Sequence, residues 1–259
     1  MSSMTLLQHA AYLACVAAAC YVQNLTGFAF GLVLLGLAGL TQVAALPDVT
    51  NVVSVLVLVN AIGLFRSSRP QFDRDAMVPV MATSLPGVLG GVLLLGWLGD
   101  NVVVVLELLL GLTIFVCAGV LLFEAKARPA RSSRVSFAGV GLVSGVLGGL
   151  FSTAGPPLVF HFYRQPLPFR VIRDTLVAIF AVNAVVRLAL MAGTGRFGSD
   201  ALWLSIEAVP LVLLQTRLMA RWPPRWQPRT IKLVVCVLLV FVAAGLVVPA
   251  LQTVWARSL

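Results

Sequence analysis

The sequence predicts an all-α polytopic membrane protein. Of its 259 residues, 60% are hydrophobic and only 10% are charged, and the mean hydropathy is +1.02. A helix that crosses a bilayer needs about 20 mostly apolar residues, and several stretches reach that length. The basic residues lie mainly in short loops between these stretches, which is the distribution of cytoplasmic loops in membrane proteins. These three observations argue against a soluble globular domain.

Hydropathy divides the chain into about ten apolar segments. They are expected at residues 5–22, 26–44, 49–65, 76–98, 101–123, 135–151, 154–163, 171–192, 201–220 and 231–252. A basic linker at 124–134 separates a first membrane repeat at 1–123 from a second membrane repeat at 135–259, with five segments in each. Residues 1–22 contain no Lys or Arg, so we expect no cleaved signal peptide, whose first region is basic.

The two halves carry matching features in the same order. Small or polar residues interrupt each half after its first segment, as QNLTGFAFG at 23–31 and as GGLFSTAGP at 148–156. Asn60 and Asn183 correspond at an offset of 123 residues. Two further pairs, Asn51 with Asp174 and Pro86 with Pro210, lie at offsets of 123 and 124. A shared order at a nearly constant offset predicts an internal duplication.

The loop charges predict that the two halves have opposite orientations. The loop after the third segment is basic in the first half (66–75) and nearly neutral in the second (193–200). The loop after the fourth segment is acidic in the first half (99–101) and strongly basic in the second (221–232). Because basic loops face the cytoplasm, equivalent loops fall on opposite sides. Such halves form an inverted-topology repeat, a common transporter architecture, with both termini outside.

The first two segments of each half are expected to form a hairpin that Gly or Pro interrupts. Irregular backbone at membrane depth is tolerated only where protein buries it or where it lines a cavity. Paired interrupted segments mark the substrate site of inverted-repeat transporters, and free backbone N–H groups at the start of a half-helix attract anions. Elsewhere, glycines repeat every four residues, as at Gly141, Gly145 and Gly149, which favours close helix packing.

The two breaks resemble those of the TauE/SafE family of sulfite and organosulfonate exporters. The matching stretches are LTGFAFG at 25–31 and STAGPP at 152–157, and the resemblance extends over nearly the whole chain. Ala29, Ala154 and Ser152 stand where the family pattern has glycine. The resemblance implies a multi-pass protein of the bacterial inner membrane that exports a small sulfur-containing or organic anion, such as sulfite, sulfoacetate or another sulfonate.

Candidate substrate-binding residues come from the breaks and from polar residues at membrane depth. The breaks and their flanks supply Asn24, Thr26, Gly27, Phe28, Ser152, Thr153, Ala154, Gly155 and Pro156. Asn60 and Asn183 are added because they are related by the repeat and repeat interfaces hold substrates; an interhelical hydrogen bond is the alternative. Arg187 offers a guanidinium fork that suits an oxyanion, and a side chain that snorkels to the outer interface is its alternative.

Glu107 and Glu207 are candidates for proton coupling, because ionisable residues inside a membrane are costly and are functional candidates by default. A structural ion pair, with Arg187 as the partner of Glu107, is the alternative. His161 lies between two Phe residues and is expected to have a structural role near the inner interface. The four cysteines lie in apolar runs without a CxxC spacing, so we expect no metal site and no cofactor. They are Cys15, Cys20, Cys117 and Cys236.

The expected function is secondary transport, by alternating access at the interface of the two repeats, with export as the direction. An anion channel for the same substrates is the alternative, which the sequence does not separate from a transporter. The sequence contains no phosphate-binding loop, HExxH motif or GxSxG elbow, which argues against ATP hydrolysis and against an enzyme. The net charge of +9 lies in loops, so the expected partners are the small anion and the lipid bilayer rather than nucleic acid. A homo-oligomer is left open.

Overall fold

The computed structural model describes residues 5–67, 69–97, 111–116, 119, 129–153, 155–222, 236, 237, 240 and 243, and these contain helices but no strand. The helices are α1 (Leu6–Thr26), α2 (Phe30–Thr41), α3 (Leu46–Ser67), α4 (Arg74–Trp97), α6 (Arg134–Phe151), α7 (Gly155–Tyr163), α8 (Phe169–Gly193) and α9 (Ser199–Arg221). The expected segments at 101–123 and 231–252 lie mostly outside the described residues. The all-helical class is confirmed.

Six of these helices are long and apolar enough to cross a membrane: α1, α3, α4, α6, α8 and α9. The other two, α2 with 12 residues and α7 with 9, are too short to cross a bilayer. The largest difference from the expected segments is at 26–44. There α1 continues to Thr26, four residues beyond the expected end of the first segment at 22. α2 begins at Phe30, four residues after the expected start of the second segment at 26.

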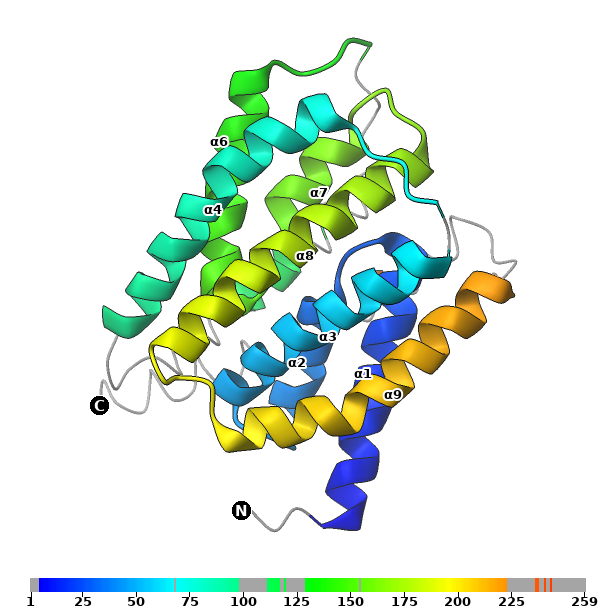
Figure 1. Cartoon of the computed structure of the whole chain (residues 1–259), viewed down its shortest axis with the longest axis vertical. Helices are drawn as coiled ribbons and strands as arrows, with labels where there is room; N and C mark the ends of the chain where they lie inside the picture. The colour runs from blue at the N-terminus through cyan, green and yellow to red at the C-terminus, as the bar shows by residue number, and fades with distance from the viewer. Residues whose placement is uncertain are drawn as a thin grey trace.

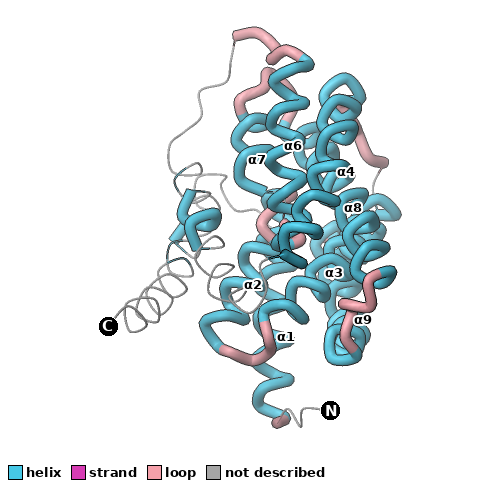
Figure 2. The backbone as a smooth tube through the Cα atoms, turned by 90° about the vertical axis from the view of Figure 1, so that its left-hand side faces the viewer, coloured by secondary structure: helices cyan, strands magenta, loops and turns pink. Residues whose placement is uncertain are grey.

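The described helices form two layers, with α4, α8, α3 and α9 in one and α6, α7, α2 and α1 in the other (Figures 1 and 2). Within these layers, one helix from each half of the chain packs against helices of the other half. α4 packs against α6 and α8, whereas α9 packs against α1 and α3. α3 and α8 pack against each other between the two groups (Figure 1). The fourth segment of each half therefore packs mainly against helices of the other half.

Glycines allow α4 and α6 to lie in close contact. A Cβ at Gly145 would overlap the carbonyl oxygen of Ser84, and a Cβ at Gly91 would overlap the carbonyl oxygen of Val146. The expectation that the glycines at four-residue spacing serve helix packing is confirmed for this pair of helices. This contact includes Gly149, two residues before the end of α6, where the second break begins.

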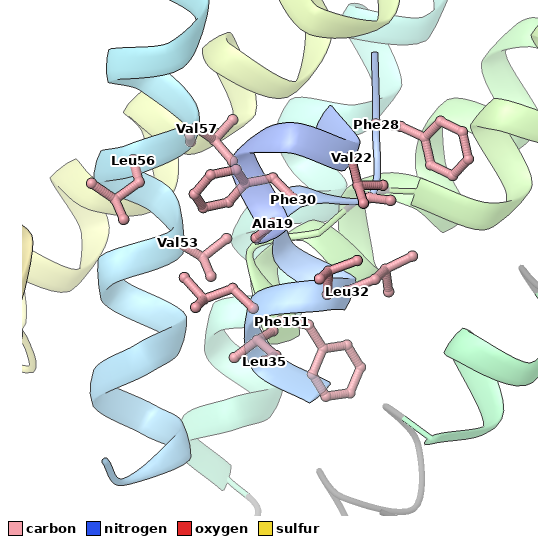
Figure 3. Packing of buried hydrophobic residues seen from close by; sticks show 14 of the residues in the cluster. Ala19, Val22, Phe28, Phe30, Leu32, Leu35, Val53, Leu56, Val57 and Phe151 are labelled. Atoms are coloured by element: carbon pink, nitrogen blue, oxygen red, sulfur yellow. The ribbon is translucent and has the colours of Figure 1, made fainter. Parts of the chain in front are cut away.

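Buried apolar side chains surround the first break, whereas large apolar side chains elsewhere face outward. Phe30, Leu32 and Phe151 are buried together with residues of α1 and α3, as Figure 3 shows. On the outside of the molecule, Trp97 and Trp203 are 84% and 65% exposed. Exposed apolar surface of this kind is what a lipid-facing helix presents.

Candidate functional site

The first break separates α1 from α2. α1 ends at Thr26, and Gly27 then adopts a left-handed conformation with φ 81°. Ala29 is also left-handed, with φ 75°, and α2 begins immediately after it at Phe30. A residue with a Cβ in this conformation costs about 1–2 kcal/mol. This backbone explains why glycine is the residue expected at position 29.

The second break separates α6 from α7 and uses the same backbone conformation. α6 ends one residue before Ser152, which is left-handed with φ 57°. α7 begins at Gly155, and Pro156 falls in its first turn, where the missing N–H of a proline costs little. Ser152 corresponds to Gly27 in the alignment of the two halves, and each residue ends a helix in the same left-handed conformation.

The two breaks contact each other. A Cβ at Gly31 of the first break would lie only 3.0 Å from the Cβ of Thr153 of the second. Between them is a pocket of about 10 Å³, lined by Gln23, Ser152 and Phe180 among others. This volume holds about one water, so in this conformation the breaks are closed on each other.

Two buried amide groups beside the breaks have free donors. Gln23 is 2% exposed, and its Oε1 accepts a hydrogen bond from the backbone N–H of Phe30 at 3.1 Å. Asn183 is 4% exposed, and its Oδ1 accepts from the hydroxyl of Ser84 at 3.0 Å. Within the described part of the chain, Gln23 Nε2 and Asn183 Nδ2 have no hydrogen-bond partner. Gln23 lines the pocket between the breaks, and Asn183 lines a second small pocket that shares Ser152 with it.

Arg187 lies inside the protein rather than at the outer interface. It is 1% exposed, so the snorkelling alternative is wrong. Its Nε donates to the carbonyl oxygen of Gly149 at 3.0 Å, and its Nη1 donates to Asn51 Oδ1 at 3.0 Å and to Ser54 Oγ at 3.1 Å. The Ser54 hydroxyl also shares a hydrogen bond with the hydroxyl of Ser152. One serine therefore connects the buried cation to the second break.

A larger cavity, of about 300 Å³, lies beside Arg187 where α3 begins and where α4, α6 and α8 end. Its polar lining includes Asn51 and Arg196. The loop that carries Arg196 is the nearly neutral loop 193–200, which the charge pattern places outside. The cavity therefore lies toward the expected outer side of the breaks.

On the other side of the first break, an ion pair covers the backbone. A Cβ at Gly27 would overlap Cγ of Arg173 and would lie 3.1 Å from its Cα. Arg173 Nη2 is 3.0 Å from Asp174 Oδ1, and Asp174 Oδ2 accepts from the backbone N–H of Gln71 at 3.1 Å. Asp174, 1% exposed, thus joins α8 to the basic loop before α4.

Comparison with known proteins identifies the family. The model of the family described as sulfite exporter TauE/SafE matches residues 12–246 of this chain. The chain belongs to the TauE/SafE family. It is also 33% identical, over 243 residues that cover 92% of this chain and 93% of the relative, to a protein of Cupriavidus necator named "Probable sulfite/organosulfonate exporter TauE". No solved structure matches. Membership places the chain among membrane transporters rather than enzymes.

In this TauE/SafE protein, Asn60 and Asn183 do not come together. Asn60 Nδ2 donates to Thr216 Oγ1 at 2.8 Å and to Asn24 Oδ1 at 3.2 Å, and Asn24 Nδ2 donates to the carbonyl oxygen of Cys20 at 2.9 Å. These bonds connect α1, α3 and α9, which is the interhelical alternative. Asn24 itself lies in the last two turns of α1 rather than in the break.

The remaining break residues mostly serve the backbone. The Thr26 hydroxyl bonds to the carbonyl oxygens of Val22 and Phe28 at 2.8 Å. Phe28 is fully buried and packs edge-on against Tyr163, with ring centroids 6.0 Å apart. Gly155 is buried beside Leu32. The candidates Ala154 and Glu107, together with Cys117, lie outside the described residues.

Glu207 lies away from the breaks, in the first half of α9. Its Oε2 is 2.9 Å from Nδ1 of His9 on α1, and the Glu207 side chain is 28% exposed. His161 is 8% exposed and packs edge-on against Phe137, with centroids 4.7 Å apart. A structural role for His161 agrees with this packing.

Four residues near the breaks were missed by the sequence reasoning as binding candidates: Gln23, Asn51, Ser54 and Arg173. Asn51 had a signal, because it corresponds to Asp174 at the same offset that relates Asn60 to Asn183. Gln23 had a weaker signal, as a polar residue at the edge of the QNLTGFAFG break. Ser54 is a short hydroxyl in an apolar helix, and such residues usually bond to their own backbone, so the sequence alone gave no reason to select it.

Proposed function

We propose that this protein is a secondary transporter that exports sulfite or a short organosulfonate. Alternating access occurs at the interface between two inverted repeats, residues 1–123 and 135–259, with 124–134 as a cytoplasmic linker, in the bacterial inner membrane with both termini outside. The observation that carries the proposal is the contact between two helix breaks, one from each half, beside two buried amide groups with free donors.

The groups at the breaks suit an oxyanion. A buried donor without a partner costs about 1–3 kcal/mol, and an anion oxygen between the breaks would satisfy Gln23 Nε2 and Asn183 Nδ2. Ser152 and Thr153 add hydroxyl groups at the same place. Arg187 lies behind Ser54, which bonds to Ser152, so its positive charge would favour an anion in the pocket by electrostatic attraction rather than by direct contact.

The packing of the helices supports an inverted repeat. The offset between the halves equates α1, α3 and α4 with α6, α8 and α9. Under this exchange, the contact of α4 with α6 becomes the contact of α9 with α1, and the contact of α4 with α8 becomes that of α9 with α3. Both contacts of α4 therefore have a counterpart in α9, as expected for two related units that pack around a common axis.

Alternating access is supported by the difference between the two sides of the breaks. The expected outer side has a cavity of about 300 Å³ beside Arg187. On the expected inner side, Arg173 packs on Gly27 and pairs with Asp174, which binds the loop before α4. We assign this conformation to an outward-facing state, and loading from the cytoplasm requires Arg173 to leave the break.

The energy for export has two sources to consider. A membrane potential that is negative inside favours anion efflux by itself. Proton coupling would use Glu107 and Glu207 as the carboxylates, with His9 as the observed partner of Glu207.

Counterflow in proteoliposomes tests the function. Vesicles are loaded with unlabelled sulfite or sulfoacetate, labelled substrate is added outside, and we expect transient accumulation of label. Gln23→Leu should lower the initial rate at least tenfold, because it removes a donor from the pocket between the breaks. Gln215→Leu is the matched control, since Gln215 donates to Ala17 on α1 instead. Equilibration without accumulation would show a channel, and no flux of either anion would refute the substrate class.

A further inference from the structure

The cavity beside Arg187 is lined by two arginines, Arg187 and Arg196. Among the residues that the structure describes, no carboxylate lies within ion-pair distance of Arg187 or Arg196. Asp48 follows the cavity residue Pro47 in the chain, but its carboxylate lies against Gly198. The lining of the cavity, within the described residues, therefore carries two arginines and no carboxylate.

Neutral groups hold the Arg187 guanidinium, and the Arg196 guanidinium lies against the backbone of α4. Arg187 uses Nε and Nη1 for its hydrogen bonds, and across the described ranges its Nη2 makes none. The Arg196 guanidinium lies against Gly96 of α4, where a Cβ would be 2.8 Å from Nη1. Asn51 donates to the carbonyl oxygen of Arg196 at 3.0 Å and accepts from Arg187 at 3.0 Å. One asparagine thus joins the Arg187 guanidinium to the backbone of the loop that carries Arg196.

The rest of the cavity wall is mostly apolar and includes Leu95 and Met191. The cavity of about 300 Å³ is roughly thirty times the volume of the pocket between the breaks, which holds about one water. This space is several times what a bare four-atom oxyanion fills. A ligand with an anionic head and a short carbon chain would bury its chain against the apolar wall.

We propose that this cavity is a second anion site, on the outer side of the breaks, for a short-chain organosulfonate. Its sulfonate group lies between Arg187 and Arg196, and its carbon chain lies against Leu95 and Met191. The hydrogen bond between Ser54 and Ser152 separates this site from the pocket between the breaks. The choice of a sulfonate rests on the proposed function, whereas the preference for an anion does not.

Cysteine labelling tests the site without measuring transport. In the full chain with its native cysteines replaced, Leu95→Cys is treated from outside with two thiosulfonate reagents of similar size, one ending in a sulfonate and one in a trimethylammonium group. The labelling rate of each reagent is divided by the rate of the same reagent with a free thiol in solution. We expect the anionic reagent to react at least fivefold faster, and sulfoacetate to slow its reaction. Thr41→Cys, exposed at the same end of the molecule, should show no preference.

Substitution of Arg196 separates charge from structure. Arg196→Gln should reduce the anion preference at Leu95→Cys at least fivefold, and Arg196→Lys should retain it. Equal rates for the two reagents, or no protection by sulfoacetate, would overturn the proposal. Anion preference and protection that persist in Gln23→Leu, while flux is lost, would support two separate sites. If the parent chain shows the anion preference and the protection but no flux, the proposed transport function would be refuted, but this site would not.

Discussion

Replacing Gly27 by alanine should destabilise the protein by two separable effects. The first is the left-handed backbone at φ 81°, which costs about 1–2 kcal/mol for a residue with a Cβ. The second is the overlap of the new Cβ with Arg173, and overpacking of this kind costs about 1–3 kcal/mol. We therefore expect a loss of about 2–5 kcal/mol in the free energy of unfolding.

Gly195→Ala is the matched control. Gly195 is also left-handed, with φ 67°, but a Cβ there would have no atom within 4 Å. It should therefore lose only about 1–2 kcal/mol. For a chain of this size, 1 kcal/mol corresponds to roughly 2–4 °C in Tm, so the two variants should differ by about 2–12 °C.

Thermal unfolding of the purified protein in a mild detergent measures both values. Combining Gly27→Ala with Arg173→Ala removes the overlapping Cγ and should recover part of the difference between the variants. Equal Tm losses for Gly27→Ala and Gly195→Ala would refute the reasoning, because they would show that Arg173 does not cover the first break.

Three further outcomes are expected. Asn60→Leu should lower the free energy of unfolding by about 1–3 kcal/mol, because it leaves the polar partners of Asn60 unpaired. The apparent KM in counterflow should stay unchanged. A large rise in KM would show that Asn60 does contribute to substrate binding. Gly91→Ala should lower Tm by several degrees through its clash with α6, whereas Gly90→Ala, which meets no atom within 4 Å, should not. Glu207→Gln should leave Tm nearly unchanged, because its pair with His9 is partly exposed, but it should abolish any stimulation of flux by a pH gradient; retained stimulation would remove Glu207 from proton coupling.

The ends of the helices followed well from the sequence. Six spans and two short helices agree with the hydropathy segments within a few residues, because the burial of apolar side chains in lipid is decided locally along the chain. The second break was predicted closely: the expected segments end at 151 and resume at 154, and α6 ends at Phe151 while α7 begins at Gly155. The first break was displaced by about four residues, because LTGFAFG contains no proline and α1 continues to Thr26.

The candidate site was predicted only in part. The two breaks do lie together, as the paired interruptions suggested. Asn60 was grouped with Asn183 by their common offset, yet the structure joins Asn60 to Thr216, 156 residues away along the chain. The positions of Gln23 and Ser54 beside the breaks depend on contacts with residues of other helices, and no local sequence pattern specifies such contacts.

By itself, the sequence determined that this is a helical membrane protein with two interrupted segments, it predicted two related halves, and it suggested the TauE/SafE family. The tertiary structure decided which polar groups are paired and which are left free. In the tertiary structure, α4 and α9 each pack against helices of the other half of the chain. Arg187 is buried against Gly149, Asn51 and Ser54, and a cavity lies between Arg187 and Arg196. The physical reason is that the helices here meet through close packing at glycines and through hydrogen bonds between distant residues. These contacts depend on the complementarity of whole helix faces, whereas hydropathy and backbone preference act within a single segment.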